Sequence, residues 1–106
     1  MSIKQLKTDE DFKEVLVEDQ AILFKHSLTC PISSEAKDEL ESFLNKHNMN
    51  AFIIHIQDNR ELSNEVADHF QIKHESPQVF WLTNGIVKDH SSHWHITVDK
   101  LEEMAK

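Results

Sequence analysis

The sequence is poor in three residue types that mark common functional sites. Its 106 residues include one glycine (Gly85), two prolines and one cysteine (Cys30). A single glycine excludes the glycine-rich loops with which P-loop and dinucleotide-binding proteins hold phosphate. A single cysteine excludes a disulfide within the chain. This is typical of proteins in a reducing cytosol, so we expect a cytoplasmic protein.

Positive charge and long apolar runs are also scarce. The chain has 11 basic and 19 acidic residues and a net charge of −8, which disfavours a nucleic-acid partner. The N-terminal residues lack the apolar stretch of a signal peptide, and no apolar run has the length of a membrane span. A content of 39% hydrophobic and 28% charged residues is ordinary for a soluble protein, and we expect one domain over residues 1–106.

Apolar periodicity predicts helices alternating with strands. Apolar residues recur at three- and four-residue steps in four predicted helices. These helices cover residues 8–18, 31–48, 60–70 and 98–105. Continuous apolar runs predict two strands buried on both faces, over residues 21–26 and 51–56. Because a helix separates these two strands, they should pair in parallel.

A hairpin is predicted near the end of the chain. Asn84-Gly85 lies between apolar runs over residues 79–82 and 86–90, and Asn-Gly is the strongest short hairpin signal. The sequence therefore predicts an α/β fold with a four-stranded mixed sheet flanked by helices. The predicted order is helix, strand, helix, strand, helix, strand, strand, helix, which is the order of a thioredoxin-like fold.

Cys30 is the strongest candidate for a reactive group. It follows the first buried run and precedes Pro31, and proline is favoured at the first position of a helix. The first amides of a helix lack partners within it and carry partial positive charge, which lowers the pKa of a thiol placed there. We therefore expect redox or nucleophilic chemistry at Cys30. A buried structural cysteine is the alternative.

Three segments carry a resemblance to a known family. Phe24-Lys25-His26-Ser27, Thr29-Cys30-Pro31-Ile32-Ser33 and Ser76-Pro77-Gln78-Val79-Phe80 resemble the monothiol bacilliredoxins. These are thioredoxin-like proteins of the bacillithiol system of low-GC Gram-positive bacteria. The resemblance extends over nearly the whole chain. Compared with thioredoxin, no tryptophan precedes Cys30, and Ser33 occupies the place of the resolving cysteine, which excludes a self-contained dithiol cycle.

The resemblance implies a monothiol thiol-disulfide oxidoreductase. Its partners would be S-bacillithiolated client proteins, from which it would remove bacillithiol through a mixed disulfide on Cys30. Bacillithiol would be a co-substrate, with no bound cofactor and no metal. Thioredoxin-like proteins also keep a cis-proline, which implies a cis Ser76–Pro77 bond near Cys30. The residues expected to bind substrate or to stabilise the thiolate are Thr29, Pro31, Ile32, Ser33, Ser76 and Pro77. Lys25 or Lys73 would hold the carboxylates of bacillithiol.

The eight histidines raise the alternative of a metal site. His90, His93 and His95 are close in sequence, but no cysteine or carboxylate cluster accompanies them at a recognised ligand spacing. We therefore expect solvated histidines. His26 could tune the thiol if it is protonated, or it could be a bystander. Trp94 could border a pocket, but we expect a partly covered surface aromatic.

Two other functions remain open at this point. The chain could carry an iron–sulfur cluster between two subunits, as some monothiol glutaredoxins do. It could also be a thioredoxin-like binding module with an inert cysteine. Colour after anaerobic reconstitution would identify the cluster carrier. An alkylation midpoint near that of free cysteine would identify the binding module.

Overall fold

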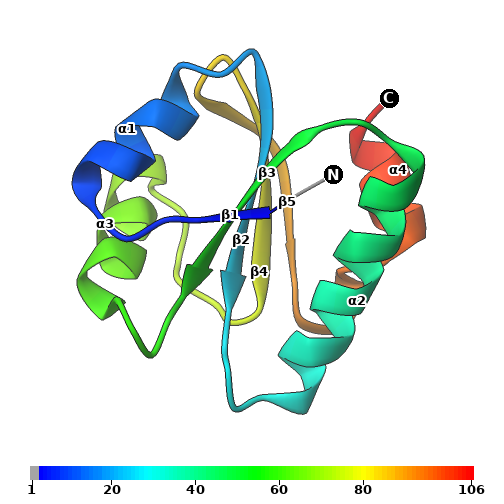
Figure 1. The fold of residues 1–106 in the computed structure, drawn as a ribbon, viewed down its shortest axis with the longest axis horizontal. Helices are drawn as coiled ribbons and strands as arrows, with labels where there is room; N and C mark the ends of the chain where they lie inside the picture. Colours follow the sequence, from blue (N-terminus) through cyan, green and yellow to red (C-terminus); the bar gives the residue numbers. More distant parts are fainter. Residues whose placement is uncertain (1–2) are drawn as a thin grey trace.

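The chain forms a five-stranded β-sheet with helices on both faces (Figure 1). The computed structural model describes residues 3–106. In chain order the elements are β1 (Ile3–Gln5), α1 (Asp9–Leu16), β2 (Gln20–His26), α2 (Pro31–Lys46), β3 (Asn50–His55), α3 (Arg60–Phe70), β4 (Gln78–Thr83), β5 (Ile86–Ser92), the 3₁₀ helix η1 (His93–His95) and α4 (Val98–Met104).

The sheet has one strand more than the sequence predicted. Its order is β1-β3-β2-β4-β5, with β1 and β2 parallel to β3, and with β4 antiparallel to both β2 and β5. The prediction of four strands, beginning with a helix, was wrong because it missed β1. Ile3-Lys4-Gln5 has only one apolar residue, so no periodicity marks it. Its strand conformation comes from pairing with β3, where Ile3 lies opposite Ala51.

The two faces of the sheet carry two separate apolar cores. In β2, Ile22 and Phe24 pack on the side of α2 and α4, whereas Ala21 and Leu23 pack on the side of α1 and α3. Figure 1 shows these helix pairs on opposite sides of the sheet. Side chains alternate across a strand, so a strand buried on both faces must be apolar throughout. This confirms the prediction made from the continuous run in β2.

Local signals fix several of the element boundaries. The Thr8 side chain accepts a hydrogen bond from the amide of Asp11 and caps α1, and Thr97 caps α4 in the same way through Lys100. In the β4–β5 hairpin, Asn84 has φ 51° and Gly85 has φ 78°. A Cβ atom added to Gly85 would lie 2.5 Å from the carbonyl oxygen of Leu16. The single glycine is therefore required both by the turn and by this close approach.

The helices of residues 3–106 are all too short or too polar to cross a membrane. The longest, α2, has 16 residues and carries charged side chains along its exposed face.

Candidate active site at the start of helix α2

Cys30 lies where a buried strand passes into the longest helix. It is the N-cap residue of α2, with φ −105° and ψ 121°, and Pro31 follows at the first helical position. The carbonyl of Cys30 accepts the first helical hydrogen bond, from the amide of Ser34 at 3.1 Å. This confirms the helix start that the sequence predicted at Cys30-Pro31.

The Cys30 thiol is accessible and has a favourable electrostatic position. The residue is partly exposed, and its side chain makes no capping hydrogen bond to the helix. The first turn of α2 contains no acidic residue. No carboxylate in that turn therefore competes with a thiolate for the free amides and the positive end of the helix dipole. This arrangement suits a cysteine thiolate that reacts with a molecule arriving from solution.

Ser33 serves the loop before Cys30. It is fully buried, and its hydroxyl accepts a hydrogen bond from the Ser27 amide at 2.9 Å and lies 2.7 Å from Nδ1 of His26. These two contacts connect the first turn of α2 to the end of β2. The Ser33 hydroxyl is thus in contact with Ser27 and His26. That it also stabilises a thiolate at Cys30 stays a prediction.

His26 is a neutral neighbour of this site. Its side chain is buried and stacks on Phe24, with ring centroids 5.5 Å apart. Burial, which is the largest cause, and the positive charges of Lys37 and His55 together lower the pKa of His26 to about 4. His26 is therefore unprotonated at neutral pH. It supplies no positive charge to the thiol. A protonated His26 therefore does not tune the thiol at neutral pH, which was one of the two roles considered for it.

Gln57 holds the loop that leads to Cys30, a role that the sequence did not reveal. Its Oε1 accepts from the amide of Leu28 at 2.9 Å, and its Nε2 donates to Ser27 Oγ at 2.8 Å and to Thr29 Oγ1 at 3.3 Å. Gln57 follows β3, and the parallel register places His55 beside His26. The predicted parallel pairing was a signal for this contact. Parallel neighbouring strands bring the residues that follow their carboxyl ends to the same edge of the sheet.

The segment containing Ser76 and Pro77 reaches the same edge of the sheet. The Ser76–Pro77 bond is cis, the geometry that the resemblance implies. Antiparallel pairing places Gln78 opposite Lys25, so Pro77 lies beside the end of β2, from which the chain continues to Cys30. Pro77 is buried, and the Ser76 hydroxyl is buried without a hydrogen-bond partner in residues 3–106.

The remaining residues expected to contact substrate differ in how exposed they are. Thr29 and Pro31 are exposed and Ile32 is partly exposed, so these three can border a substrate. Lys25 cannot do so, because its side chain is fully buried and its Nζ donates to the Ser63 carbonyl at 2.9 Å. Within residues 3–106, no group of histidine, cysteine and acidic side chains has a geometry that could hold a metal ion.

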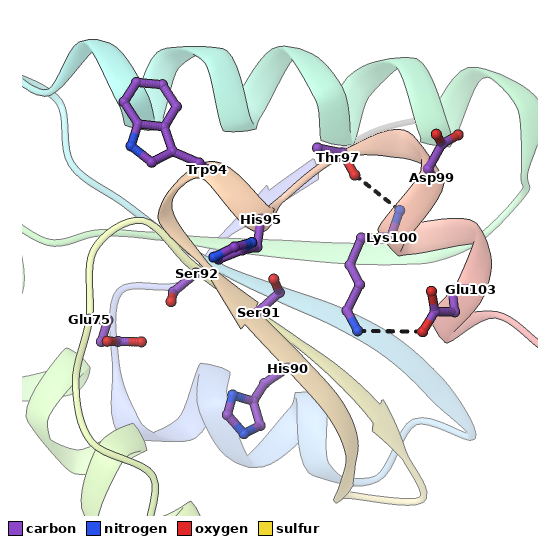
Figure 2. A pocket seen from close by; sticks show the side chains of 10 residues that line it. All are labelled: Glu75, His90, Ser91, Ser92, Trp94, His95, Thr97, Asp99, Lys100 and Glu103. Atoms are coloured by element: carbon purple, nitrogen blue, oxygen red, sulfur yellow. Dashed lines mark hydrogen bonds and ion pairs between the residues drawn. The ribbon is translucent and has the colours of Figure 1, made fainter.

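Two cavities share Trp94 of η1, and one of them reaches Ile32 of this site. One, of about 310 Å³, lies between α2 and η1, and another, of about 600 Å³, lies between β5 and α4. Trp94 lines both cavities, and Figure 2 shows its ring directed toward α2. Trp94 is a surface aromatic, as expected, but it is more exposed than a partly covered one, at 65%, and it also borders a pocket.

Comparison with known proteins gives one family and one fold. Residues 4–101 match the family model of monothiol bacilliredoxin BrxC. A solved structure described as a candidate oxidoreductase with a thioredoxin fold is 32% identical. Its TM-score is 0.94, and the match covers 98% of this chain and 94% of that one.

Thioredoxins of more distant sequence share the fold. Thioredoxin from Trypanosoma brucei brucei has a TM-score of 0.78 at 13% identity, covering 98% of this chain and 91% of that one. The thioredoxin pre-protein of Schistosoma mansoni has a TM-score of 0.75 at 15% identity, covering 98% and 95%. At these identities the likeness concerns the fold alone.

Proposed function

Because this chain belongs to the monothiol bacilliredoxin family, we propose that it is a thiol-disulfide oxidoreductase that removes bacillithiol from cysteines of client proteins. The observation that carries the proposal is the position of Cys30. A partly exposed cysteine caps a 16-residue helix whose first turn has no acidic residue. As the only cysteine of the chain, it fits a mechanism that needs one sulfur of the protein.

The first step is a thiol–disulfide exchange. The Cys30 thiolate attacks the bacillithiol sulfur of the client's mixed disulfide. A sulfur–sulfur bond forms between Cys30 and bacillithiol, and the bond to the client sulfur breaks. The client cysteine leaves as a thiolate and takes a proton from solvent. Such exchange requires an accessible thiolate, and the partial exposure of Cys30 at the N-cap of α2 supports this role.

A second exchange regenerates the enzyme. The thiolate of a free bacillithiol molecule attacks the bacillithiol sulfur on Cys30. Cys30 leaves as a thiolate, and oxidised bacillithiol is released for a separate reductase. In the sum of the two steps, the mixed disulfide of the client is consumed and one bacillithiol disulfide is formed. The client cysteine becomes a free thiol, and its bacillithiol leaves joined to the free bacillithiol, which supplies the reducing equivalents. The protein holds no bound cofactor in this scheme.

The neighbouring residues position the two substrates. The free amides of the first turn of α2 stabilise the thiolate. These are the amides after Pro31, since Pro31 itself has no N–H group to donate. Thr29 and Ile32 form the rim around the sulfur, and the backbone of Ser76 pairs with an extended client segment. The exposure of Thr29, the partial exposure of Ile32 and the position of Ser76 beside the end of β2 support these roles.

The test is release of bacillithiol from an S-bacillithiolated client protein. Wild-type protein with free bacillithiol should release it catalytically, and Cys30→Ala should release none above the uncatalysed rate. Without free bacillithiol, mass spectrometry should detect one bacillithiol adduct, on Cys30. Activity retained in Cys30→Ala, or inactivity of a folded wild-type protein, would overturn the proposal. Circular dichroism of the variant verifies that it is folded.

A further inference from the structure

A groove runs along the N-terminal half of α2 and reaches Ile32, two residues after Cys30. It has a volume of about 310 Å³. Ile32, Glu35 and Asp38 line it from α2, and Trp94 and Ile96 line it from η1 and the residue that follows. The mechanism proposed above uses only Ile32 from this groove, so the remainder has no assigned role.

Trp94 is the feature that marks this groove as a binding surface. Among residues 3–106, four large apolar side chains are exposed, and Trp94 is the only aromatic one, at 65%. Figure 2 shows that its ring stands clear of the sheet. A single exposed apolar side chain is ordinary on a protein surface, but Trp94 lines a groove together with Ile32 and Ile96. The face of an indole is also the best aromatic partner for a cation.

The polar side of the same groove is negatively charged. Glu35 and Asp38 are exposed, and neither makes a hydrogen bond or an ion pair within the part of the chain that the structure describes. Glu39 differs, because its carboxylate accepts a hydrogen bond from the amide of Val98 at 3.0 Å. The groove therefore presents an indole face together with two free carboxylates. This combination is complementary to an arginine or lysine side chain.

The groove is fixed relative to the thiol from both sides. One wall belongs to α2, which begins at Cys30, and Ile32 is only two residues further along. The other wall is anchored to the cis-proline segment, since the amide of His93 donates to the carbonyl of Pro77 at 3.0 Å. Pro77 lies beside the end of β2. A side chain bound in the groove would therefore belong to a residue close to the cysteine that reacts.

We propose that this groove binds an arginine or lysine side chain of the client protein, next to the cysteine that carries bacillithiol. This inference rests on the proposed function and adds a client preference to it. Clients with a basic residue near the modified cysteine are bound and turned over better than clients with a neutral or acidic residue there. The net charge of −8 favours the encounter with such positively charged segments.

Binding is tested separately from chemistry. The probes are nine-residue peptides with a central bacillithiolated cysteine and one arginine placed in turn at each position from three before to three after it. Matched peptides carry glutamine instead. Calorimetry on Cys30→Ala measures binding without exchange. We expect the best arginine peptide to bind about fivefold more tightly than its glutamine partner, and 0.5 M salt to reduce that ratio.

Variants locate the effect in the groove. Glu35→Gln with Asp38→Asn, and separately Trp94→Ala, should reduce the arginine preference to less than twofold. Glu41→Gln is the matched control, because Glu41 is exposed on the same helix but lies outside the groove. It should keep the full preference. With wild-type Cys30, the same ratios should appear in kcat/KM for bacillithiol release.

The outcomes separate the two proposals. Equal binding of arginine and glutamine peptides, or a preference that survives both sets of groove variants, overturns the groove proposal. If no peptide is debacillithiolated but the arginine preference in binding persists, the proposed function fails and the groove is a cation site of a binding module. If all peptides are processed without preference, only the groove proposal fails.

Discussion

At the scale of single residues, the buried imidazole of His26 affects how the stability depends on pH. His26 is buried near the positive charges of Lys37 and His55, and its pKa is lowered to about 4. In the unfolded chain a histidine has a pKa near 6.5. The unfolded state therefore binds more protons than the folded state between these values. The stability from the neutral imidazole is complete above pH 6.5 and is lost as the pH falls toward 4.

We expect His26→Gln to remove this part of the acid sensitivity. In the wild type the group accounts for a loss of up to about 3 kcal/mol between pH 6.5 and 4. Glutamine keeps a polar partner for Ser33 but does not titrate. Urea unfolding at several pH values should give a shallower slope for His26→Gln, and an unchanged slope for the exposed control His95→Gln. Equal slopes for His26→Gln and the wild type would contradict this account.

Lys25 is a buried cation without a carboxylate. Its Nζ donates to the Ser63 carbonyl and lies 3.1 Å from Nδ1 of His74, and the Phe80 ring is 5.9 Å away. Burial lowers the pKa of Lys25 to about 8. In the unfolded chain a lysine has a pKa near 10.4, so between pH 8 and 10.4 the unfolded state binds more protons than the folded state. The charge is unfavourable in the folded state below pH 8, and this penalty disappears as the pH rises toward 10.4.

Replacing Lys25 with methionine should remove a rise of stability at alkaline pH. The wild type should gain up to about 3 kcal/mol from this group between pH 8 and 10.4, whereas Lys25→Met should not. Unfolding by urea across that range provides the measurement. Lys73→Met, at an exposed position, is the control and should behave like the wild type. A rise of the same size in Lys25→Met would exclude Lys25 as its source.

At the scale of elements, the loop over residues 27–29 depends on a neighbouring strand for its shape. Gln57 makes three hydrogen bonds to this loop from the carboxyl end of β3, and Ser33 makes one from α2. The loop is exposed at Leu28 and Thr29, so buried apolar contacts contribute little to holding it. Its conformation, and with it the approach to Cys30, therefore rests on these polar contacts.

Gln57→Ala should impair exchange more than it impairs folding. We expect the rate of thiol–disulfide exchange at Cys30 to fall about tenfold, because small misplacements of reacting groups are costly. The free energy of unfolding should fall by less than about 1.5 kcal/mol, because Gln57 is exposed. Stopped-flow exchange with a model disulfide and urea unfolding measure the two effects. Asn64→Ala, on the exposed surface of α3, should change neither, and an unchanged exchange rate in Gln57→Ala would contradict the role.

At the scale of the whole molecule, the two apolar cores share one sheet. The central strand β2 contributes Ile22 and Phe24 to one core and Ala21 and Leu23 to the other. Loss of either core removes the surface against which the other is packed. A chain of 106 residues whose two cores share one sheet should unfold in one cooperative step.

Leu40→Ala tests this coupling. Leu40 is fully buried between α2 and the sheet, and its truncation should reduce the free energy of unfolding by about 2–5 kcal/mol. Tryptophan fluorescence reports mainly on the core that contains Trp81, whereas far-ultraviolet circular dichroism reports on the entire chain. Their transitions should coincide in the wild type and in Leu40→Ala. Ser42→Ala, exposed on the same helix, should change stability by less than about 0.5 kcal/mol, and separate transitions would contradict a single unit.

Local sequence patterns predicted most of the elements but not every strand. Helix α3 has the predicted bounds, and the helix start at Cys30-Pro31 and the turn at Asn84-Gly85 are confirmed. Each depends on periodicity or on residues adjacent in the chain. β1 was missed because its conformation depends on pairing with a strand almost fifty residues away. The role of Gln57 was missed because its contacts are also to residues distant in the chain, which neighbouring strands bring beside it.

By itself the sequence determined an α/β chain of alternating elements, with one cysteine at the start of a helix and no second sulfur, because these features are local or are counts. The tertiary structure decided what surrounds that cysteine. It placed neutral His26 against Ser33, Gln57 on the loop before Cys30, Lys25 in the interior, and Trp94 beside α2. These placements depend on which strands are neighbours and on which face each side chain points to. Strand order and packing fix both, and no single segment encodes them.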